Sequence, residues 1–452
     1  MKDQNDETKP TSVVATPQQA GEARARDPWW WVERCVWTEC MLTRLTTSES
    51  ANRVWFRLWE KTYAPANLQS ALQKVWRNGG SAGADKQTVA HFARHAEEEL
   101  QRLHEQLREG TYRPQPVRRA WIPKPGSNDK RPLGIPAVRD RIVQGALRHV
   151  VEPIFETEFA EHSYGFRPGR GAKDALRQVD TLLKAGHEWV VDADLKSYFD
   201  TIPHERLLAL MKERVADGRV LALVESFLRA GVLEEAKGWQ PTERGTPQGG
   251  VISPLLANLY LNPLDQQMER AGWAMVRYAD DFVILCRGEA EAHAALEMVR
   301  HWVNEAGLTL HPEKTRVVDA GAPGGFDFLG YHFERGMKWP REKSLKKLKD
   351  RVRAKTSRLD GRSLKDIVAD VNRSLRGWYG YFQHSKANTF DTVDGYVRRR
   401  LRSLLQWRRD GVGKGIGATH QRWPNEWFAR RGLLSLKAEH EWTRTIVRLR
   451  TH

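Results

Sequence analysis

Two adjacent aspartates at the tip of an apolar hairpin constrain this sequence more than any other feature. Residues 275–286 are predicted to form two strands, with Ala279-Asp280-Asp281 at the turn between them. Adjacent carboxylates repel each other, so they are costly at such a tip unless a cation lies between them. Oxygen ligands on a rigid hairpin suit the hard cation Mg²⁺. Alone, the tetrapeptide is a weak indication, because an Asp-Asp pair at a turn is usually only a turn.

A second source of carboxylates lies upstream, at the end of an apolar strand. Residues 189–194 alternate in polarity, so Asp192 and Asp194 share one face of the predicted strand. An acid at the end of a buried strand, together with an acidic hairpin, meets the needs of two-metal phosphoryl transfer. One ion activates the attacking 3′-hydroxyl, and the other holds the triphosphate and the leaving pyrophosphate. Asp200 lies nearby, and alternation alone does not choose among the three aspartates.

The composition changes along the chain and suggests its organisation. Residues 1–27 are polar, and we expect them to be disordered. Residues 28–112 carry Trp and Leu at helical spacing and form an expected N-terminal helical extension. Strands alternate with helices over residues 113–335, whereas residues 340–410 are helical and strongly basic. A further basic helical segment is expected over residues 418–452.

The charge and the cysteines limit the classes of partner and site. A formal net charge of +16 favours a polyanionic partner, because neutralising phosphates releases bound counterions. Only three cysteines are present, which makes a disulfide framework or a four-cysteine zinc site improbable. The sequence has no apolar run of the roughly 18 residues that a membrane-spanning helix needs, and no secretory signal pattern. We therefore expect a cytoplasmic protein without a membrane partner.

Several segments, in this order along the chain, resemble the motifs of reverse transcriptases, in the form found in bacterial group II introns. They are Ser163-Tyr164-Gly165-Phe166-Arg167-Pro168-Gly169, residues 194–200, residues 245–258 around Pro247-Gln248-Gly249, Tyr278-Ala279-Asp280-Asp281, residues 307–315 and Phe328-Leu329-Gly330. Together they cover roughly residues 80 to 335.

The resemblance implies a fold, an activity and a metal site. The implied fold is α+β: a right-hand polymerase with fingers and palm, built from an antiparallel sheet plus helices, followed by an α-helical thumb and maturase domain. The implied activity is RNA-directed DNA synthesis by two-metal nucleotidyl transfer. The motif match selects Asp194, with Asp280 and Asp281, as the catalytic residues and the ligands of two Mg²⁺ ions.

The same resemblance implies a pocket for the incoming nucleotide. Phe199 lies where the family has its steric gate, and its ring would clash with a 2′-hydroxyl; Tyr198 is the alternative if Phe199 is core packing. Gln248 is expected to line the pocket. Two further segments of the chain are expected to supply cations for the triphosphate.

These cations lie in the predicted fingers and beyond the hairpin. Lys124 and Arg131 flank a loop that resembles the fingers loop gripping the triphosphate, and Lys130 could replace Arg131. Lys314 is a further candidate near the triphosphate. A solvated basic turn is the competing interpretation for the loop.

The C-terminal region resembles the thumb and maturase domain of the same family. The resemblance rests on residues 375–382, residues 423–428 and an arginine cluster over residues 398–409. We expect Trp378, Tyr381 and Phe382 to be core residues. We expect the arginines to contact RNA through its phosphates; the predicted contacts are Arg398, Arg399, Arg400 and Arg402.

One departure from many family members affects the expected mobility pathway. No cysteine follows Cys286, so we expect no His/Cys endonuclease domain, as in class C introns, and priming from another source such as a nascent strand. The expected partners are group II intron RNA, an RNA template with a DNA primer, dNTPs and target DNA. The alternatives are a domesticated reverse transcriptase in phage defence or a CRISPR system, and an RNA-binding splicing factor without polymerase activity.

Overall fold

The computed structural model describes residues 27–47, 53–123, 130–411 and 417–450. Apart from Asp27, the tail expected to be disordered lies outside these residues, and so does Lys124. The described chain forms two compact units, which we describe one at a time. No helix within the described ranges is long and apolar enough to span a membrane.

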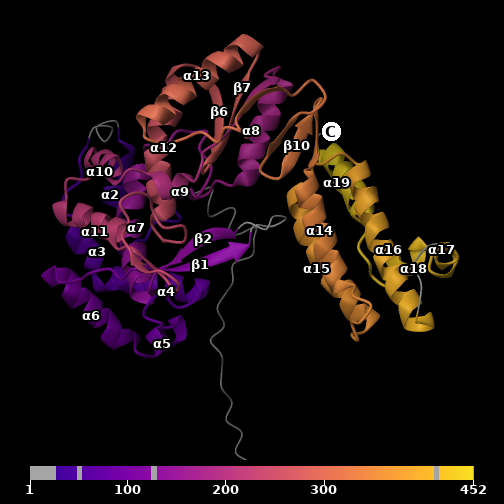
Figure 1. Cartoon of the computed structure of the whole chain (residues 1–452), viewed down its shortest axis with the longest axis horizontal. Coiled ribbons are helices and arrows are strands. Elements are labelled where there is room, and N and C mark those ends of the chain that lie inside the picture. The colour runs from indigo at the N-terminus through magenta and orange to yellow at the C-terminus, as the bar shows by residue number, and fades with distance from the viewer. Residues whose placement is uncertain (1–26, 48–52, 124–129, 412–416, 451–452) are drawn as a thin grey trace, which may run out of the picture. The chain divides into compact units, whose positions relative to one another are not determined.

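The first unit comprises three stretches of chain, Met1–Pro116, Pro136–Glu158 and Leu208–Ala230, and its described residues form a helical bundle. Its helices are α2 (Glu39–Thr46), α3 (Trp59–Tyr63), α4 (Pro65–Asn78), α5 (Val89–Arg94), α6 (Ala96–Glu109), α7 (Val138–Glu156) and α11 (Gly218–Arg229), while α10 (His204–Lys212) runs across a boundary of the unit (Figure 1).

Helix α7 is the centre of this bundle, because nearly all of its residues are buried. It packs closely on α4, where a Cβ at Gly145 would lie 3.3 Å from the Cβ of Ala71. The side chain of Asn67 in α4 donates to the carbonyl of Ala146, 3.0 Å away, and satisfies a polar group inside the contact. Within the predicted N-terminal helical region, the described residues form helices α2 to α6, joined by turns and irregular segments.

The second unit contains all the strands and the C-terminal helices. The strands are β1 (Val117–Pro123), β2 (Lys130–Ile135), β3 (Trp189–Asp194), β4 (Val232–Glu234), β5 (Gly238–Gln240), β6 (Ala274–Tyr278), β7 (Asp281–Cys286), β8 (Arg316–Asp319), β9 (Phe326–Phe328), β10 (Tyr331–Glu334) and β11 (Met337–Pro340). The helices are α8 (Ala172–Lys184), α9 (Tyr198–Thr201), α12 (Ser253–Arg270), α13 (Glu289–Glu305), α14 (Glu342–Lys355), α15 (Leu364–Phe382), α16 (Asn388–Asp410), α17 (Thr419–Arg422), α18 (Asn425–Ala429) and α19 (Leu436–Arg450).

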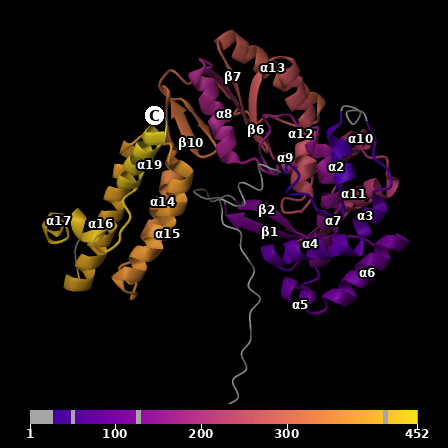
Figure 2. The same cartoon turned by 180° about the vertical axis from the view of Figure 1, so that it is seen from behind.

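A four-stranded antiparallel sheet in the order β6-β7-β3-β8 is the centre of this unit. Helices α8, α12 and α13 pack against it, as both views show (Figures 1 and 2). Strand β7 is apolar on both faces because helices α8 and α13 pack against it: it is buried at every position after Asp281. The expected α+β fold, an antiparallel sheet with helices followed by a helical C-terminal region, is confirmed.

The C-terminal helices share one continuous apolar core with the end of the sheet. This core contains Val283 of β7, Phe328 of β9, Leu375 of α15 and Leu401 of α16. Of the three rings expected to be core, Trp378 and Phe382 are buried in it, and Tyr381 packs against it partly buried. Their burial agrees with the expectation that these rings are core rather than RNA-stacking surfaces.

Candidate active site

Three aspartates lie at one end of the central sheet because of the pairing between β3 and β7. Asp194 is the last residue of β3, and it pairs in register with Asp281, the first residue of β7. Strand β6 ends at Tyr278, so Ala279 and Asp280 form the turn of the β6–β7 hairpin. The register of one sheet thus brings together carboxylates that are more than 80 positions apart in the sequence.

Burial and mutual repulsion set the protonation of these carboxyl groups. Burial, with added repulsion from Asp192, Asp280 and Asp194, raises the pKa of Asp281 to about 7. Burial also raises the pKa of Asp280, although the positive charge of Arg131 opposes that shift. Such shifts indicate that the site lacks positive charge, which a divalent cation would supply.

The chemistry of the donor set fits a hard divalent cation, since all three candidate ligands offer carboxylate oxygens. In the described part of the chain, no three His, Cys, Asp or Glu side chains converge closely enough to hold a metal ion. Instead, the ammonium group of Lys314 contacts the carboxylate of Asp194. The exposed lysine thereby occupies part of the space in which a cation would neutralise that carboxylate.

Asp192, the competing candidate from strand alternation, has a different partner. Its carboxylate lies 3.4 Å from Nε of Arg316 on the neighbouring strand β8. Burial is the main cause that raises the pKa of Asp192 to about 6, and Arg316 opposes the shift. Asp192 is therefore paired with an arginine of β8, although its charge also acts on Asp281, whereas Asp194 pairs in register with Asp281 itself.

A buried arginine, which the sequence analysis did not select, holds the acidic turn. The side chain of Arg277 in β6 is fully buried, and it forms an ion pair with Asp265 of α12. It also donates to the carbonyl of Ala279 at 2.8 Å and to the side-chain oxygen of Asn258 at 3.0 Å. A lone arginine inside an apolar strand was the available signal, because buried arginine is rare unless paired.

The segment around Gly165 packs directly against the same turn. A Cβ at Gly165 would lie only 2.2 Å from the backbone nitrogen of Ala279. The carbonyl of Gly165 accepts a hydrogen bond of 2.7 Å from the amide of Asn258. Ala279 itself has a φ of 60°, which few residues other than glycine adopt without support. The neighbouring segment thus supports the strained turn.

The aromatic pair after Asp194 divides into a core residue and a half-exposed one. Tyr198 is 2% exposed, and its hydroxyl donates to the carbonyl of Ala257 at 2.6 Å. Phe199 is half-buried, and its ring meets that of Phe166 edge to face, with centroids 6.4 Å apart. Of the two rings, only Phe199 is therefore placed to meet a ligand.

The Pro-Gln-Gly segment approaches strand β2 at backbone level. The backbone nitrogen of Gly134 donates to the carbonyl of Gln248 at 2.7 Å. Gly249 has a φ of 118°, and a Cβ there would lie 2.4 Å from the carbonyl oxygen of Gly134, so only glycine fits. The side-chain amide of Gln248 lies 3.5 Å from a carboxylate oxygen of Asp200.

The predicted triphosphate ligands are only partly described. Arg131 is exposed in β2, opposite Ile122 of β1, and its charge opposes the rise in the pKa of Asp280 that burial causes. Lys124 lies outside the described residues. Lys314 contacts Asp194, as noted above, so this lysine and this arginine both act electrostatically on the aspartate cluster.

The four arginines of α16 that are predicted to bind RNA, Arg398, Arg399, Arg400 and Arg402, differ in their burial. Arg402 is 3% exposed, and it donates to the carbonyl of Trp423 at 2.9 Å and to the side chain of Asn425 at 2.9 Å. It is therefore a structural residue that holds the following segment. Arg400 is half-buried against Thr356, and only Arg399 of the four is exposed.

Comparisons with known proteins assign two domains to the chain. Residues 122–333 match the family described as reverse transcriptase (RNA-dependent DNA polymerase), and residues 345–423 match the group II intron maturase-specific domain. Protein YkfC of Escherichia coli (strain K12) is 38% identical to the chain, over 52% of the chain and 71% of YkfC.

Two intron-encoded relatives are longer than this chain. The group II intron-encoded protein LtrA of Lactococcus lactis subsp. cremoris is 38% identical, over 51% of the chain and 38% of LtrA. An uncharacterised 91 kDa protein in the cob intron of Schizosaccharomyces pombe is 45% identical, over 34% of the chain and 19% of that protein. The chain thus spans most of YkfC but less than half of the intron-encoded relatives.

Proposed function

Because the chain belongs to the group II intron reverse transcriptase family with a maturase-specific domain, we propose that it copies intron RNA into DNA and assists the splicing and mobility of a group II intron. The observation that carries the proposal is the joining of Asp194 to the Asp280-Asp281 hairpin by the β3–β7 register. The enzyme is then an RNA-directed DNA polymerase.

The three aspartates are proposed to hold the divalent ions on which the family depends, and we propose that these are two Mg²⁺ ions. When bound, the ions supply charge neutralisation for the attacking 3′-hydroxyl and the leaving pyrophosphate. The carboxylates of Asp280 and Asp281 have raised pKa values without a cation, so they would release protons as the ions bind. Lys314 would then move from Asp194 toward the negatively charged triphosphate.

The remaining proposed contacts orient the nucleotide. Lys124, which lies outside the described residues, and Arg131 of β2 would bind the triphosphate, because an ammonium and a guanidinium match its charge. Gln248 would line the pocket, fixed at its backbone by the bond to Gly134. Phe199, half-exposed beside Phe166, would exclude a 2′-hydroxyl by steric contact.

The maturase function is proposed for the basic C-terminal helices. Of the four arginines predicted to bind RNA, Arg399 is the exposed one, and Arg398 and Arg400 are half-buried neighbours. The maturase-specific match at residues 345–423 supports this function, and it favours an intron-encoded protein over a domesticated reverse transcriptase. Besides intron RNA, the proposed partners are an RNA template with a DNA primer, dNTPs and target DNA. We also propose that the protein acts in the cytoplasm.

The domain boundaries are part of the proposal. We propose an N-terminal helical extension over 28–112, fingers and palm over 113–335, thumb and maturase over 340–410, and a basic helical segment over 418–452. The two matched ranges, 122–333 and 345–423, support this division.

Primer extension on an RNA template tests the polymerase function. The wild-type protein is expected to extend a DNA primer in Mg²⁺, whereas Asp281→Asn should lose on the order of a thousandfold in rate, because a metal ligand that stabilises transition-state charge is worth several kcal/mol. Glu297→Gln, an exposed change in α13, is the control for the loss of one carboxylate. Substantial extension by Asp281→Asn, or none by the wild type, would contradict the proposal.

A further inference from the structure

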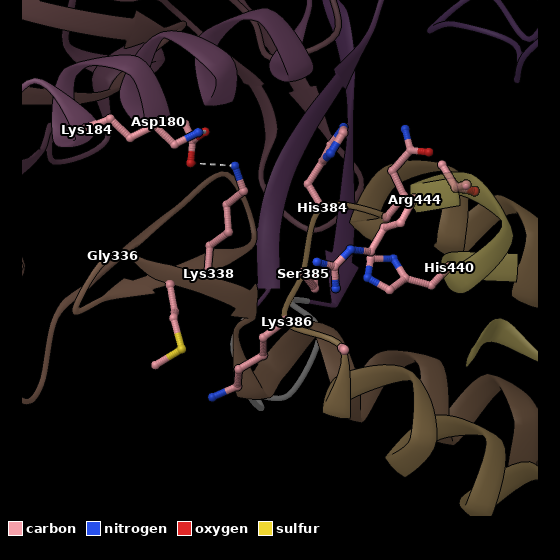
Figure 3. Close-up of a pocket in the computed structure, with 13 residues that line it drawn as sticks. Asp180, Lys184, Gly336, Lys338, His384, Ser385, Lys386, His440 and Arg444 are labelled. Atoms are coloured by element: carbon pink, nitrogen blue, oxygen red, sulfur yellow. Dashed lines mark hydrogen bonds and ion pairs between the residues drawn. The ribbon is translucent and has the colours of Figure 1, made fainter. Parts of the chain in front are cut away.

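A basic pocket lies away from the aspartate cluster, in the second unit. It has a volume of about 610 Å³, and its walls come from the end of α8, the β10–β11 turn, the loop before α16, and α19. Figure 3 shows Asp180 and Lys184 on one side, His440 and Arg444 on the other, and residues 384–386 between them. None of these residues was selected from the sequence.

The charge of this pocket is strongly unbalanced. Four cationic side chains line it, and Asp180 is the one acid among the lining residues. That acid is already neutralised, since its carboxylate contacts Lys184 and Lys338, each at 2.7 Å. The pocket therefore keeps an excess of positive charge that can attract an anion. The cationic side chains that supply this charge are Lys184, Lys338, Lys386 and Arg444.

The wall of the pocket also contains two histidines, and burial and the neighbouring cations lower the pKa of both. Burial and then the charge of Lys338 lower the pKa of His384. Burial and then the charge of Arg444 lower the pKa of His440. Both imidazoles are consequently neutral at pH 7, and a neutral imidazole can both donate and accept hydrogen bonds. The pocket thus combines cations with groups that can bind a hydroxyl.

Two of the cations, Lys338 and Lys386, are held in place by the fold before any ligand binds. Lys338 lies on β11 and is anchored by its bond to Asp180. The backbone nitrogen of Lys386 donates to the carbonyl of Lys338 at 3.0 Å, and the ammonium of Lys386 lies 3.4 Å from the centroid of the Trp339 ring. Prior ordering lowers the entropic cost of binding an anion.

We propose that this pocket binds backbone phosphates of the intron RNA, as a contact separate from the aspartates and from the α16 arginines. Phosphodiester oxygens accept hydrogen bonds from ammonium and guanidinium groups, and the neutral imidazoles suit the 2′-hydroxyl, which distinguishes RNA from DNA. The proposal rests on the proposed maturase function, which supplies the RNA. It adds a site, on the β10–β11 turn and α19, that would help to fix the position of the bound intron.

The test removes two cations that are not paired with Asp180. Lys386→Gln/Arg444→Gln should weaken intron RNA binding about twentyfold near 0.15 M salt, and it should reduce the salt slope by about 0.7 to 0.9 per lost phosphate contact. Lys386→Arg/Arg444→Lys retains both charges and should restore most of the affinity. Arg270→Gln/Arg300→Gln, which changes two exposed arginines of α12 and α13, is the control matched in charge.

The readouts separate this site from the polymerase function. The pocket variant should extend a short primer–template at the wild-type rate and unfold at the wild-type temperature, yet splice the intron poorly. Unchanged RNA affinity and salt slope would overturn the proposal, and so would an equal loss in the control variant. A loss of binding to target DNA alone would also overturn it. Failure of the wild type to make cDNA would instead count against the proposed polymerase.

Discussion

Replacing Arg277 tests whether the acidic turn depends on a buried ion pair. Arg277→Met would leave Asp265, whose side chain is 5% exposed, without its partner. Breaking a buried pair by removing one partner costs about 3 to 5 kcal/mol, because the other charge stays buried. The carbonyl of Ala279 and the side-chain oxygen of Asn258 would each lose a donor as well. We therefore expect a loss of unfolding free energy of at least about 3 kcal/mol.

A second variant separates stability from the position of the turn. Arg277→Met/Asp265→Leu removes both charges, and replacing a buried pair by apolar side chains is often nearly neutral. It should recover most of the unfolding free energy. The carbonyl of Ala279 still lacks its donor, which costs about 1 to 3 kcal/mol, and we expect that cost to appear as misplacement of Asp280 and Asp281. Primer extension should then stay about ten- to hundredfold slow in kcat.

The assays are urea unfolding and steady-state primer extension with varied dNTP. Arg270→Met, at an exposed arginine of α12, is the matched control and should change neither result. The reasoning fails if Arg277→Met unfolds within about 1 kcal/mol of the wild type. It also fails if the double variant regains the wild-type rate, because then the bond to Ala279 does not position the turn.

Three other outcomes test separate parts of the structure. Phe199→Val should admit ribonucleotides while some deoxynucleotide incorporation remains, and unchanged selectivity in competition assays would make Phe199 a packing residue. The variant Asp280→Ala/Asp281→Ala should bind and splice the intron but make no cDNA. Arg399→Gln should instead weaken RNA binding at every sequence alike. A splicing defect in the folded aspartate variant would refute this separation of the two functions. Burial lowers the pKa of His149 to about 3. Below about pH 6.5 the unfolded chain therefore binds a proton that the folded chain does not bind. The unfolding free energy consequently decreases as the pH falls below about 6.5. The loss should reach about 2 kcal/mol at pH 5, and unfolding curves of His149→Gln should lack this part of the pH dependence.

The strands that carry the aspartates could be predicted from the sequence, because local alternation defines them. The strand predicted over residues 189–194 has the same bounds in the structure, and the acidic hairpin, predicted over 275–286, begins one residue earlier and ends at the same residue. A period of two places Asp192 and Asp194 on one face of the strand whatever the rest of the chain does. The motif order then identified the family, and the matched domains confirm that identification.

The partners of each side chain were decided only by the tertiary structure. The helical arginine cluster was predicted as one RNA-binding surface, but residues 423–425 cover Arg402 and accept its hydrogen bonds. Helical spacing shows which residues share a face, and it contains no information about which distant segment packs on that face. The same reason hid the roles of Arg277 and Gly165, since α12 and the acidic turn meet them only in the folded chain. Burial converts a charged or small residue into a structural one, and burial is a property of long-range packing.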